Sequence, residues 1–306
     1  MATLDCSVAR HHSAAKPGYR GRLAPSPTGY LHVGHARTFW TAQERARAAG
    51  GTLVMRMEDL DPDRSRKEYA DAALEDLRWL GLRWDEGPDV GGPFGPYAQS
   101  ERGELYRAAW EKLRAGGWIY PCRCSRNDLA AALNAPHEGA EALEDEPVYP
   151  GTCRPRRGEN SEAARAAQKT LVGEAGANWR FRVPDGEAIE FVDGNLGPQR
   201  FVAGVDFGDF VVMRRDGVSS YQLACVVDDA AMQITEVVRG ADLLKSTARQ
   251  MLLNRALGFA DPKWFHCGLV VDENGKRLAK RSDAVSVRAL RERGKRPGEI
   301  LHGILL

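Results

Sequence analysis

Two histidines stand three residues apart in the segment His32-Val-Gly-His35, which follows a loop dense in proline and glycine. Residues three apart at the start of a helix share one face, so we expect the two imidazoles side by side. Gly34 has no side chain and would let a ligand approach the backbone. A helix N-terminus also carries partial positive charge. The pattern predicts a triphosphate site, and a pair of capping or surface histidines is the alternative.

A second candidate for phosphate chemistry lies far downstream, where four cations follow a glycine turn. They are Lys276, Arg277, Lys280 and Arg281. A solvated basic loop is the ordinary interpretation of such a cluster. The functional interpretation is a loop that closes on the triphosphate and stabilises the charge that develops in phosphoryl chemistry.

Three cysteines form a third candidate site. Cys122 and Cys124 lie before a stretch rich in alanine and glutamate, and Cys153 follows it. Three thiolates and one further ligand can bind zinc tetrahedrally. No histidine adjoins Cys153, and His137 is the nearest candidate for the fourth position. Spacing alone therefore leaves two interpretations open: a zinc site, or three free thiols in an inserted segment.

The composition limits the class of protein. The chain has 306 residues, of which 43% are hydrophobic, and 43 basic against 42 acidic residues give a net charge of +1. These values exclude collagen-like, coiled-coil and wholly disordered chains, and a nucleic-acid binder driven by overall charge. Six cysteines are too few for a disulfide scaffold. Apolar runs are shorter than the roughly 18 residues of a membrane span, and residues 1–18 lack a signal-peptide core, so we expect a cytoplasmic protein without membrane contact.

The order of the predicted elements is that of an α/β protein. A strand at 20–24, a helix at 31–49 and a strand at 52–57 form a βαβ unit, which predicts a parallel sheet. Further helices are predicted at 66–80, 102–115 and 242–257, and further strands at 210–214, 237–238 and 267–271. Cys225 and Cys267 lie in apolar sequence and are expected in the core.

Changes in composition along the chain predict its division into parts. We expect a flexible tail at 1–18, the first half of an α/β domain at 19–105 and its second half at 206–289. Residues 106–205 are predicted to be an inserted subdomain, because much of this stretch is small and polar with little apolar periodicity. Residues 290–306 are predicted to form a short basic helix.

Together these features resemble the glutamyl-tRNA synthetase branch of the class I aminoacyl-tRNA synthetases. The resemblance rests on Ala24-Pro-Ser-Pro-Thr-Gly, Leu31-His-Val-Gly-His-Ala-Arg, Arg56-Met-Glu-Asp-Leu-Asp and Val237-Val-Arg-Gly-Ala-Asp. The second signature of the family is usually Lys-Leu-Ser-Lys or Lys-Met-Ser-Lys. In this chain Arg277 and Ala279 replace its first lysine and its serine, and Lys280 is kept.

The resemblance implies a Rossmann-like class I synthetase catalytic domain with a zinc-bearing α+β insertion. The catalytic residues would be His32, His35 and Lys280, which with Gly34 would bind ATP, accompanied by Mg²⁺. The glutamate-binding residues would be Arg22, Ser26, Glu58, Tyr221 and Arg239. Among these, Arg22 and Arg239 would grip the carboxylate, and Glu58 would bind the ammonium group. Ordinary ion pairs are the alternative interpretation for any one of these residues.

The resemblance also implies the fourth ligand of the cysteine site. A small branch of the family, the glutamyl-Q tRNA(Asp) synthetases, binds zinc with Cys-x-Cys and Tyr-x-x-x-Cys. The matching positions are Cys122, Cys124, Tyr149 and Cys153, and the linker between Cys124 and Tyr149 is long. All four positions would then be filled by the protein, which is typical of a structural site.

Only residues 282–306 follow the second signature, which is too short for an anticodon-binding domain and favours the same branch. The branch activates glutamate with ATP without tRNA and transfers it to queuosine at the wobble position of tRNA(Asp). We expect a monomer with glutamate, ATP and that tRNA as its partners.

Three alternatives stay open. The first is a shortened glutamyl-tRNA synthetase that charges tRNA(Glu). The second is a nucleotidyltransferase of the histidine-x-glycine-histidine type, which would not need the carboxylate pocket. The third is a non-catalytic RNA-binding module, against which the intact His32, His35 and Lys280 argue.

Overall fold

The computed structural model describes residues 18–124, 148–155, 176–268 and 286–305. The basic segment that contains Lys280, Arg277 and Ala279 lies outside these ranges, as do His137 and residues 1–17. Within the described ranges, no helix is both long enough and apolar enough to cross a membrane.

The chain opens with the predicted βαβ unit. Strand β1 (Arg20–Leu23), helix α1 (Val33–Ala48) and strand β2 (Thr52–Met55) follow in order, and the two strands pair in parallel. Helix α1 buries a stripe with helical spacing, made of Ala36, Phe39, Ala42 and Ala46. The helix ends where Gly50 adopts a positive φ of 57°, a conformation that glycine tolerates best. The predicted unit and its parallel pairing are confirmed.

Helices α2 (Lys67–Trp79) and α3 (Gly103–Ala115) come next, joined by a loop that contains the short helix η1 (Gln99–Glu101). Helix α2 packs with α1 and β1 through a shared apolar cluster in which Leu77 is fully buried. Helix α3 belongs to a second cluster, which it shares with α6 and with the strands of the inserted stretch.

The later part of the chain supplies the remaining elements around the site. They are α6 (Tyr221–Ala231), β8 (Glu236–Gly240), η2 (Ala241–Leu243), α7 (Leu244–Leu257) and β9 (Lys263–Cys267). Strand β8 pairs with β9 in parallel and lies beside β1, where Thr235 N donates to the Arg20 carbonyl at 2.9 Å. Strand β9 ends at Cys267, the first residue of the strand expected at 267–271, and residues 269–271 of that prediction lie outside the described ranges.

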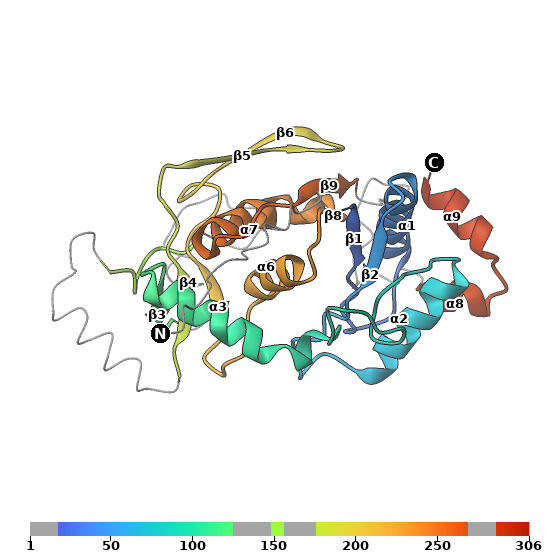
Figure 1. The fold of residues 1–306 in the computed structure, drawn as a ribbon, viewed down its shortest axis with the longest axis horizontal. Helices are drawn as coiled ribbons and strands as arrows, with labels where there is room; N and C mark the ends of the chain where they lie inside the picture. Colours follow the sequence, from blue (N-terminus) through green and yellow to red (C-terminus); the bar gives the residue numbers. More distant parts are fainter. Residues whose placement is uncertain (1–17, 125–147, 156–175, 269–285, 306) are drawn as a thin grey trace, which may run out of the picture.

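The described strands between Ile119 and Met213 form one further sheet and a hairpin. Strands β3 (Ile119–Cys122), β4 (Asn178–Phe181) and β7 (Phe210–Met213) make an antiparallel sheet in that order. Strands β5 (Ala188–Asp193) and β6 (Gly197–Val202) form a hairpin. The hairpin joins β9 in parallel, giving the strand order β6-β5-β9-β8. Figure 1 shows this hairpin reaching back over α7 toward β9.

The basic stretch near the C-terminus forms two short helices, α8 (Val287–Glu292) and α9 (Pro297–Leu305). Gly294, with a φ of 79°, lies between them. Arg288 and Arg291 of α8 pair with Glu75 of α2 at 2.6 and 2.8 Å. These two cations are therefore engaged within the protein, and they hold the end of the chain against the first half of the fold (Figure 1).

Candidate active site and metal centre

The two histidines cap helix α1. His32 is the N-cap residue, and its Nδ1 accepts a hydrogen bond from Gly34 N at 3.1 Å. His35 Nδ1 accepts in turn from His32 N at 3.3 Å, which completes a capping box. The rings stack with centroids 3.7 Å apart. A Cβ on Gly34 would lie only 2.9 Å from His32 Cε1, so this glycine makes room for the histidine ring as well as for a ligand.

This cap fixes the hydrogen-bonding role of each ring. A neutral imidazole has one donor and one acceptor nitrogen, and both Nδ1 atoms accept here. The proton of the neutral ring is therefore on Nε2, which makes Nε2 a donor toward an anion such as a phosphate. The backbone after the basic segment returns to this point, because Ser286 forms a β-bridge with His32 and Val287 N donates to the Leu31 carbonyl at 2.7 Å.

An ion-pair cluster lies behind the proposed amino-acid site. Arg56 is fully buried and donates to Glu58 Oε1 at 3.0 Å and to Asp229 Oδ1 at 2.6 Å. Burial lowers the pKa of Arg56, but Asp229 and Glu58 outweigh it and raise this pKa well above its usual range. Arg22 donates to the Val238 carbonyl at 2.9 Å and lies 3.6 Å from Asp229. Arg22 is thereby fixed between β1 and β8.

Helix α6 presents one face to this cluster. Ser220 caps the helix by accepting from Leu223 N, and Tyr221, Cys225 and Asp229 follow at intervals of four residues. Cys225 Sγ donates to Glu58 Oε1 at 3.4 Å. Both described contacts of the Glu58 carboxylate therefore use Oε1, and Oε2 can meet an ammonium group.

The Tyr221 hydroxyl interacts electrostatically with Glu58, Arg239 and Arg22. Burial raises the pKa of Tyr221 well above its usual range, Glu58 adds to the rise, and the charges of Arg239 and Arg22 oppose it. The Tyr221 hydroxyl is thus a neutral hydrogen-bonding group at physiological pH.

Arg239 differs from Arg22 and Arg56 because its described polar partners are all neutral. Its side chain is buried, and its partners are the neutral acceptors His266 Nε2 at 3.1 Å, Gln250 Oε1 at 2.9 Å and Thr247 Oγ1 at 2.7 Å. Trp264 lies under the guanidinium, 5.0 Å from ring centroid to Cζ. Among the described residues, no carboxylate lies within ion-pairing distance of Arg239. A buried cation of this kind is stabilised when a ligand supplies the missing anion.

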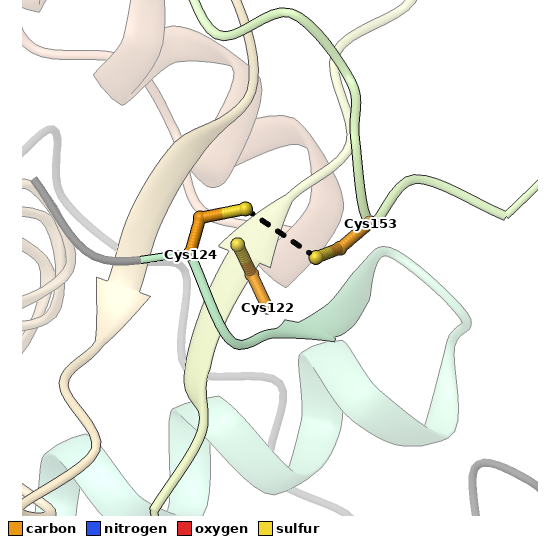
Figure 2. Close-up of side chains that lie close together, drawn as sticks. All are labelled: Cys122, Cys124 and Cys153. Carbon is orange, nitrogen blue, oxygen red and sulfur yellow. Dashed lines mark hydrogen bonds between the residues drawn. The ribbon is translucent and has the colours of Figure 1, made fainter. Parts of the chain in front are cut away.

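The three predicted cysteines converge in the inserted stretch. Cys122, Cys124 and Cys153 point their sulfur atoms toward one another (Figure 2), and all three sulfurs lie within 4.8 Å of each other. The Sγ atoms of Cys124 and Cys153 are 3.5 Å apart, too far for a disulfide. The Tyr149 hydroxyl is 3.4 Å from Cys122 Sγ and 3.7 Å from Cys124 Sγ. The cysteine cluster could hold a metal ion.

These distances match a tetrahedral zinc site with an oxygen ligand. With Zn–S bonds of about 2.3 Å and a Zn–O bond of about 2.0 Å, tetrahedral geometry places neighbouring sulfurs roughly 3.8 Å apart and the oxygen roughly 3.5 Å from each sulfur. Burial raises the pKa of the Cys124 thiol to about 11 and the pKa of Tyr149 above its usual range. A bound dication would favour the ionised forms of both groups.

A buried arginine accompanies the metal-ligand candidates. Arg180 Nε donates to Cys122 Sγ at 3.3 Å, and the Arg180 guanidinium lies 4.0 Å from the centre of the Tyr149 ring. Arg180 Nη1 also donates to the Asp209 carbonyl at 2.9 Å, which fixes its position. Three thiolates and a phenolate around a bound dication would carry net negative charge, and the guanidinium would balance part of it.

The chain is similar to proteins that join amino acids to tRNA. A family model for the class I tRNA synthetases (E and Q), catalytic domain, matches residues 19–306. The glutamyl-Q tRNA(Asp) synthetase of Symbiobacterium thermophilum is 52% identical over 92% of this chain and 84% of its own length. The chain belongs to the glutamyl-Q tRNA(Asp) synthetase family of class I synthetases.

Two further comparisons support the family at the level of sequence and of fold. The glutamyl-Q tRNA(Asp) synthetase of Nitratidesulfovibrio vulgaris is 49% identical over 90% of this chain and 82% of its own length. The crystal structure of a glutamate tRNA ligase from Elizabethkingia meningosepticum, in complex with its amino acid, superposes with a TM-score of 0.80 at 28% identity. That match covers 94% of this chain and 60% of the ligase chain. The family fold, a class I synthetase catalytic domain, agrees with the Rossmann-like prediction.

Of the residues predicted for the synthetase pocket, four lie in one electrostatic neighbourhood: Arg22, Glu58, Tyr221 and Arg239. Ser26 differs from these four. Its side chain is exposed, and its carbonyl accepts from Thr28 N at 2.8 Å. The adjacent Pro25 carbonyl, however, accepts from Glu58 N at 2.9 Å, so the loop supports the pocket through its backbone. The prediction for Lys280 lies outside the described residues.

The sequence analysis missed several residues that hold the synthetase pocket together. Helix α6 was not predicted, although Ser220 before an apolar run is a usable N-cap signal. Cys225 is buried as predicted, but it also touches Glu58. His266 and Asp193 gave no local signal, because their roles depend on contacts between β5 and β9.

His266 gives this synthetase a testable pH dependence. Burial lowers the pKa of His266 to about 4, and Arg239 adds to this effect. Between pH 6.5 and about pH 4, His266 binds a proton in the unfolded chain but not in the folded chain. Acid therefore favours unfolding in this range. The contribution of His266 to the free energy of unfolding should be complete above pH 6.5 and fall by about 2–3 kcal/mol by pH 4.5.

Urea unfolding of the wild type and of His266→Gln at pH 7.5 and pH 4.5 measures this contribution. The decrease in the free energy of unfolding from pH 7.5 to pH 4.5 should be smaller in the variant by about 2–3 kcal/mol. Equal losses in the two proteins would contradict the neutral, buried state of His266.

Proposed function

We propose that this protein activates glutamate with ATP and then transfers the glutamyl group to queuosine in tRNA(Asp). The observation that carries the proposal is the buried Arg239, which has only neutral partners among the described residues. Its planar fork suits a substrate carboxylate, and Arg22 lies in the same pocket. The Glu58 carboxylate, whose described contacts use only Oε1, suits the α-ammonium group of an amino acid.

The first reaction forms an acyl-adenylate. The α-carboxylate of glutamate attacks the α-phosphorus of ATP, and pyrophosphate leaves with the electrons of the broken P–O bond. The nucleophile is already ionised, so positioning and electrostatic stabilisation dominate. His32 and His35 would donate from Nε2 to phosphate oxygens, and Lys280 would add charge. Mg²⁺ bound to ATP would neutralise further charge on the phosphates.

The second reaction transfers the activated acyl group. A hydroxyl of queuosine attacks the glutamyl carbonyl, and AMP leaves. The relatives named glutamyl-Q tRNA(Asp) synthetase support this acceptor. We propose that the inserted stretch around residues 106–205 faces the RNA.

For the metal centre we propose one structural zinc ion held by Cys122, Cys124, Cys153 and Tyr149. The spacings of the Tyr149 hydroxyl from Cys122 and Cys124, and of Cys124 from Cys153, support this assignment because they are close to those of a tetrahedral site. Zinc would join the end of β3 to the segment that carries Tyr149 and Cys153.

The deciding experiment is ATP–pyrophosphate exchange with each amino acid, with and without tRNA. We expect exchange with glutamate in the absence of tRNA, because protein contacts alone already hold Arg22, Arg239 and Glu58 in place. Transfer of labelled glutamate to tRNA(Asp) with and without queuosine then tests the acceptor. Exchange that requires tRNA, together with charging of tRNA(Glu), would instead favour a glutamate–tRNA ligase, the name of relatives such as that of Halorhodospira halophila at 44% identity.

Changing His35 to alanine should slow glutamate activation by about 30- to 1000-fold. The substitution removes one preorganised donor, which costs about 2–4 kcal/mol in the activation barrier. It also removes half of the capping box, so stability should fall by about 1 kcal/mol. Exchange kinetics and urea unfolding separate the two effects. His302→Ala, at an exposed histidine of α9, is the matched control. An unchanged exchange rate in His35→Ala would remove this residue from the mechanism.

A further inference from the structure

A chain of buried hydrogen bonds connects the β5–β6 hairpin to the guanidinium of Arg239. Asp193, the last residue of β5, accepts from His266 Nδ1 with Oδ2 at 2.6 Å. His266 Nε2 then accepts from Arg239 Nε at 3.1 Å. The side chains of Asp193 and His266 are completely buried, and Arg239 is 4% exposed. This chain is the direct polar link between the inserted hairpin and the proposed carboxylate site.

The carboxylate of Asp193 is held in one orientation. Its Oδ1 accepts three backbone N–H groups, from Asn195 at 3.0 Å, Leu196 at 2.9 Å and His266 at 3.2 Å. Oδ2 is thereby left facing the His266 ring and accepts a hydrogen bond from its Nδ1–H. The His266 tautomer is therefore the one with hydrogen on Nδ1, which leaves Nε2 as an acceptor.

This tautomer determines what Arg239 can do. A guanidinium has five N–H donors, and the described contacts of Arg239 use Nε once, Nη1 once and Nη2 once. One donor remains on each terminal nitrogen, which is the number that a carboxylate accepts in a bidentate pair. His266, Gln250 and Thr247 fix the plane in which those two donors lie.

We propose that Asp193 and His266 are positioning residues for amino-acid recognition, which orient Arg239 so that its two remaining terminal N–H donors meet the substrate carboxylate. The proposal rests on the proposed function, because it names the support of the same pocket. It also assigns a role to the β5–β6 hairpin, which places Asp193 beside β9 and so completes the glutamate site from the inserted stretch.

The substitution Asp193→Asn tests the proposal with almost no change of shape. The three backbone donors should hold the amide oxygen at Oδ1, so the amide NH₂ faces His266 Nδ1. His266 Nδ1 must then accept, which moves the ring proton to Nε2, opposite the Arg239 Nε–H. Two donors would face each other, and the guanidinium should shift. The histidine tautomer can be read directly from ring nitrogen chemical shifts in ¹⁵N NMR.

Kinetics of ATP–pyrophosphate exchange provide the second readout. In Asp193→Asn we expect the KM for glutamate to rise about tenfold or more, while the KM for ATP stays within about twofold. His266→Gln and His266→Asn are a matched pair. The glutamine oxygen can replace the acceptor at Nε2, and the shorter asparagine reaches only the position of Nδ1. We expect a glutamate KM near the wild-type value for His266→Gln and an increase of about tenfold for His266→Asn.

The control is Asp261→Asn, which also removes one carboxylate charge close to β9. In the described structure Asp261 accepts a side-chain hydrogen bond only from Asn254. Urea unfolding of all variants shows which of them remain folded under assay conditions. An altered tautomer with an unchanged glutamate KM, or equal increases in both KM values, would overturn the proposal. If the wild-type protein shows no glutamate-dependent exchange, the proposed function fails and this proposal fails with it. Normal wild-type exchange with an unaffected Asp193→Asn refutes the positioning role alone.

Discussion

Replacing Arg239 with alanine is expected to raise the KM for glutamate by at least about 30-fold while leaving the KM for ATP nearly unchanged. Truncating one partner of a buried, hydrogen-bonded charge pair costs about 2–5 kcal/mol. The substrate carboxylate would lose a bidentate partner whose side chain is almost completely buried. The proposed ATP site, at the N-terminus of α1, does not include this side chain. Exchange kinetics with each substrate varied in turn measure the effect.

Two further measurements identify why the KM for glutamate rises in Arg239→Ala. Arg239→Lys keeps the charge but not the planar fork, so its glutamate KM should lie between those of the wild type and the alanine variant. Glutamine should be a poor substrate of the wild type, because its neutral amide leaves the arginines without a counter-charge. Arg255→Ala is the control, since Arg255 lies on the exposed side of α7 and pairs with Glu187. Normal glutamate binding by Arg239→Ala would show that the pocket is wrongly assigned.

Replacing Cys124 with serine is expected to remove the metal from the protein. Metal analysis of the freshly purified wild type should find about one zinc ion per chain, and the serine variant should retain little of it. A structural zinc site contributes its binding free energy to folding, so the segment from Val148 to Pro155 should become sensitive to proteases. Glutamate activation should largely survive, because the proposed glutamate pocket uses β1, the segment after β2, α6 and β8, supported from β5 and β9, and none of these carries a proposed metal ligand. Transfer to tRNA should fall.

Tyr149→Phe is the matched variant for the same site. It removes only the oxygen ligand, and three thiolates remain. We therefore expect zinc to stay bound but to be lost to a competing chelator at a lower concentration than in the wild type. A wild-type protein that contains no zinc when prepared without chelators would contradict the site. Loss of zinc that also abolished activation would show that the metal supports the catalytic core instead.

The order of residues along the chain by itself determined the βαβ unit at the start of the fold. The apolar strands and the capped helix are local features, so β1, α1 and β2 could be predicted with an error of one or two residues at each end. The spacing of Cys122, Cys124 and Cys153 showed that thiols could meet, although not that they do. The charged residues Arg22, Glu58 and Arg239 were marked because they match short motifs of the synthetase family that the sequence resembles.

Only the tertiary structure decided how those residues are held. Asp193 and His266 are 73 positions apart, and their contact exists because a hairpin from the inserted stretch adds to the edge of the catalytic sheet. Likewise, Cys225 was predicted as a plain core residue and touches the Glu58 carboxylate. Sequence periodicity reports which side of an element is apolar, whereas the protonation, tautomer and free donors of a buried polar group depend on atoms brought from distant elements.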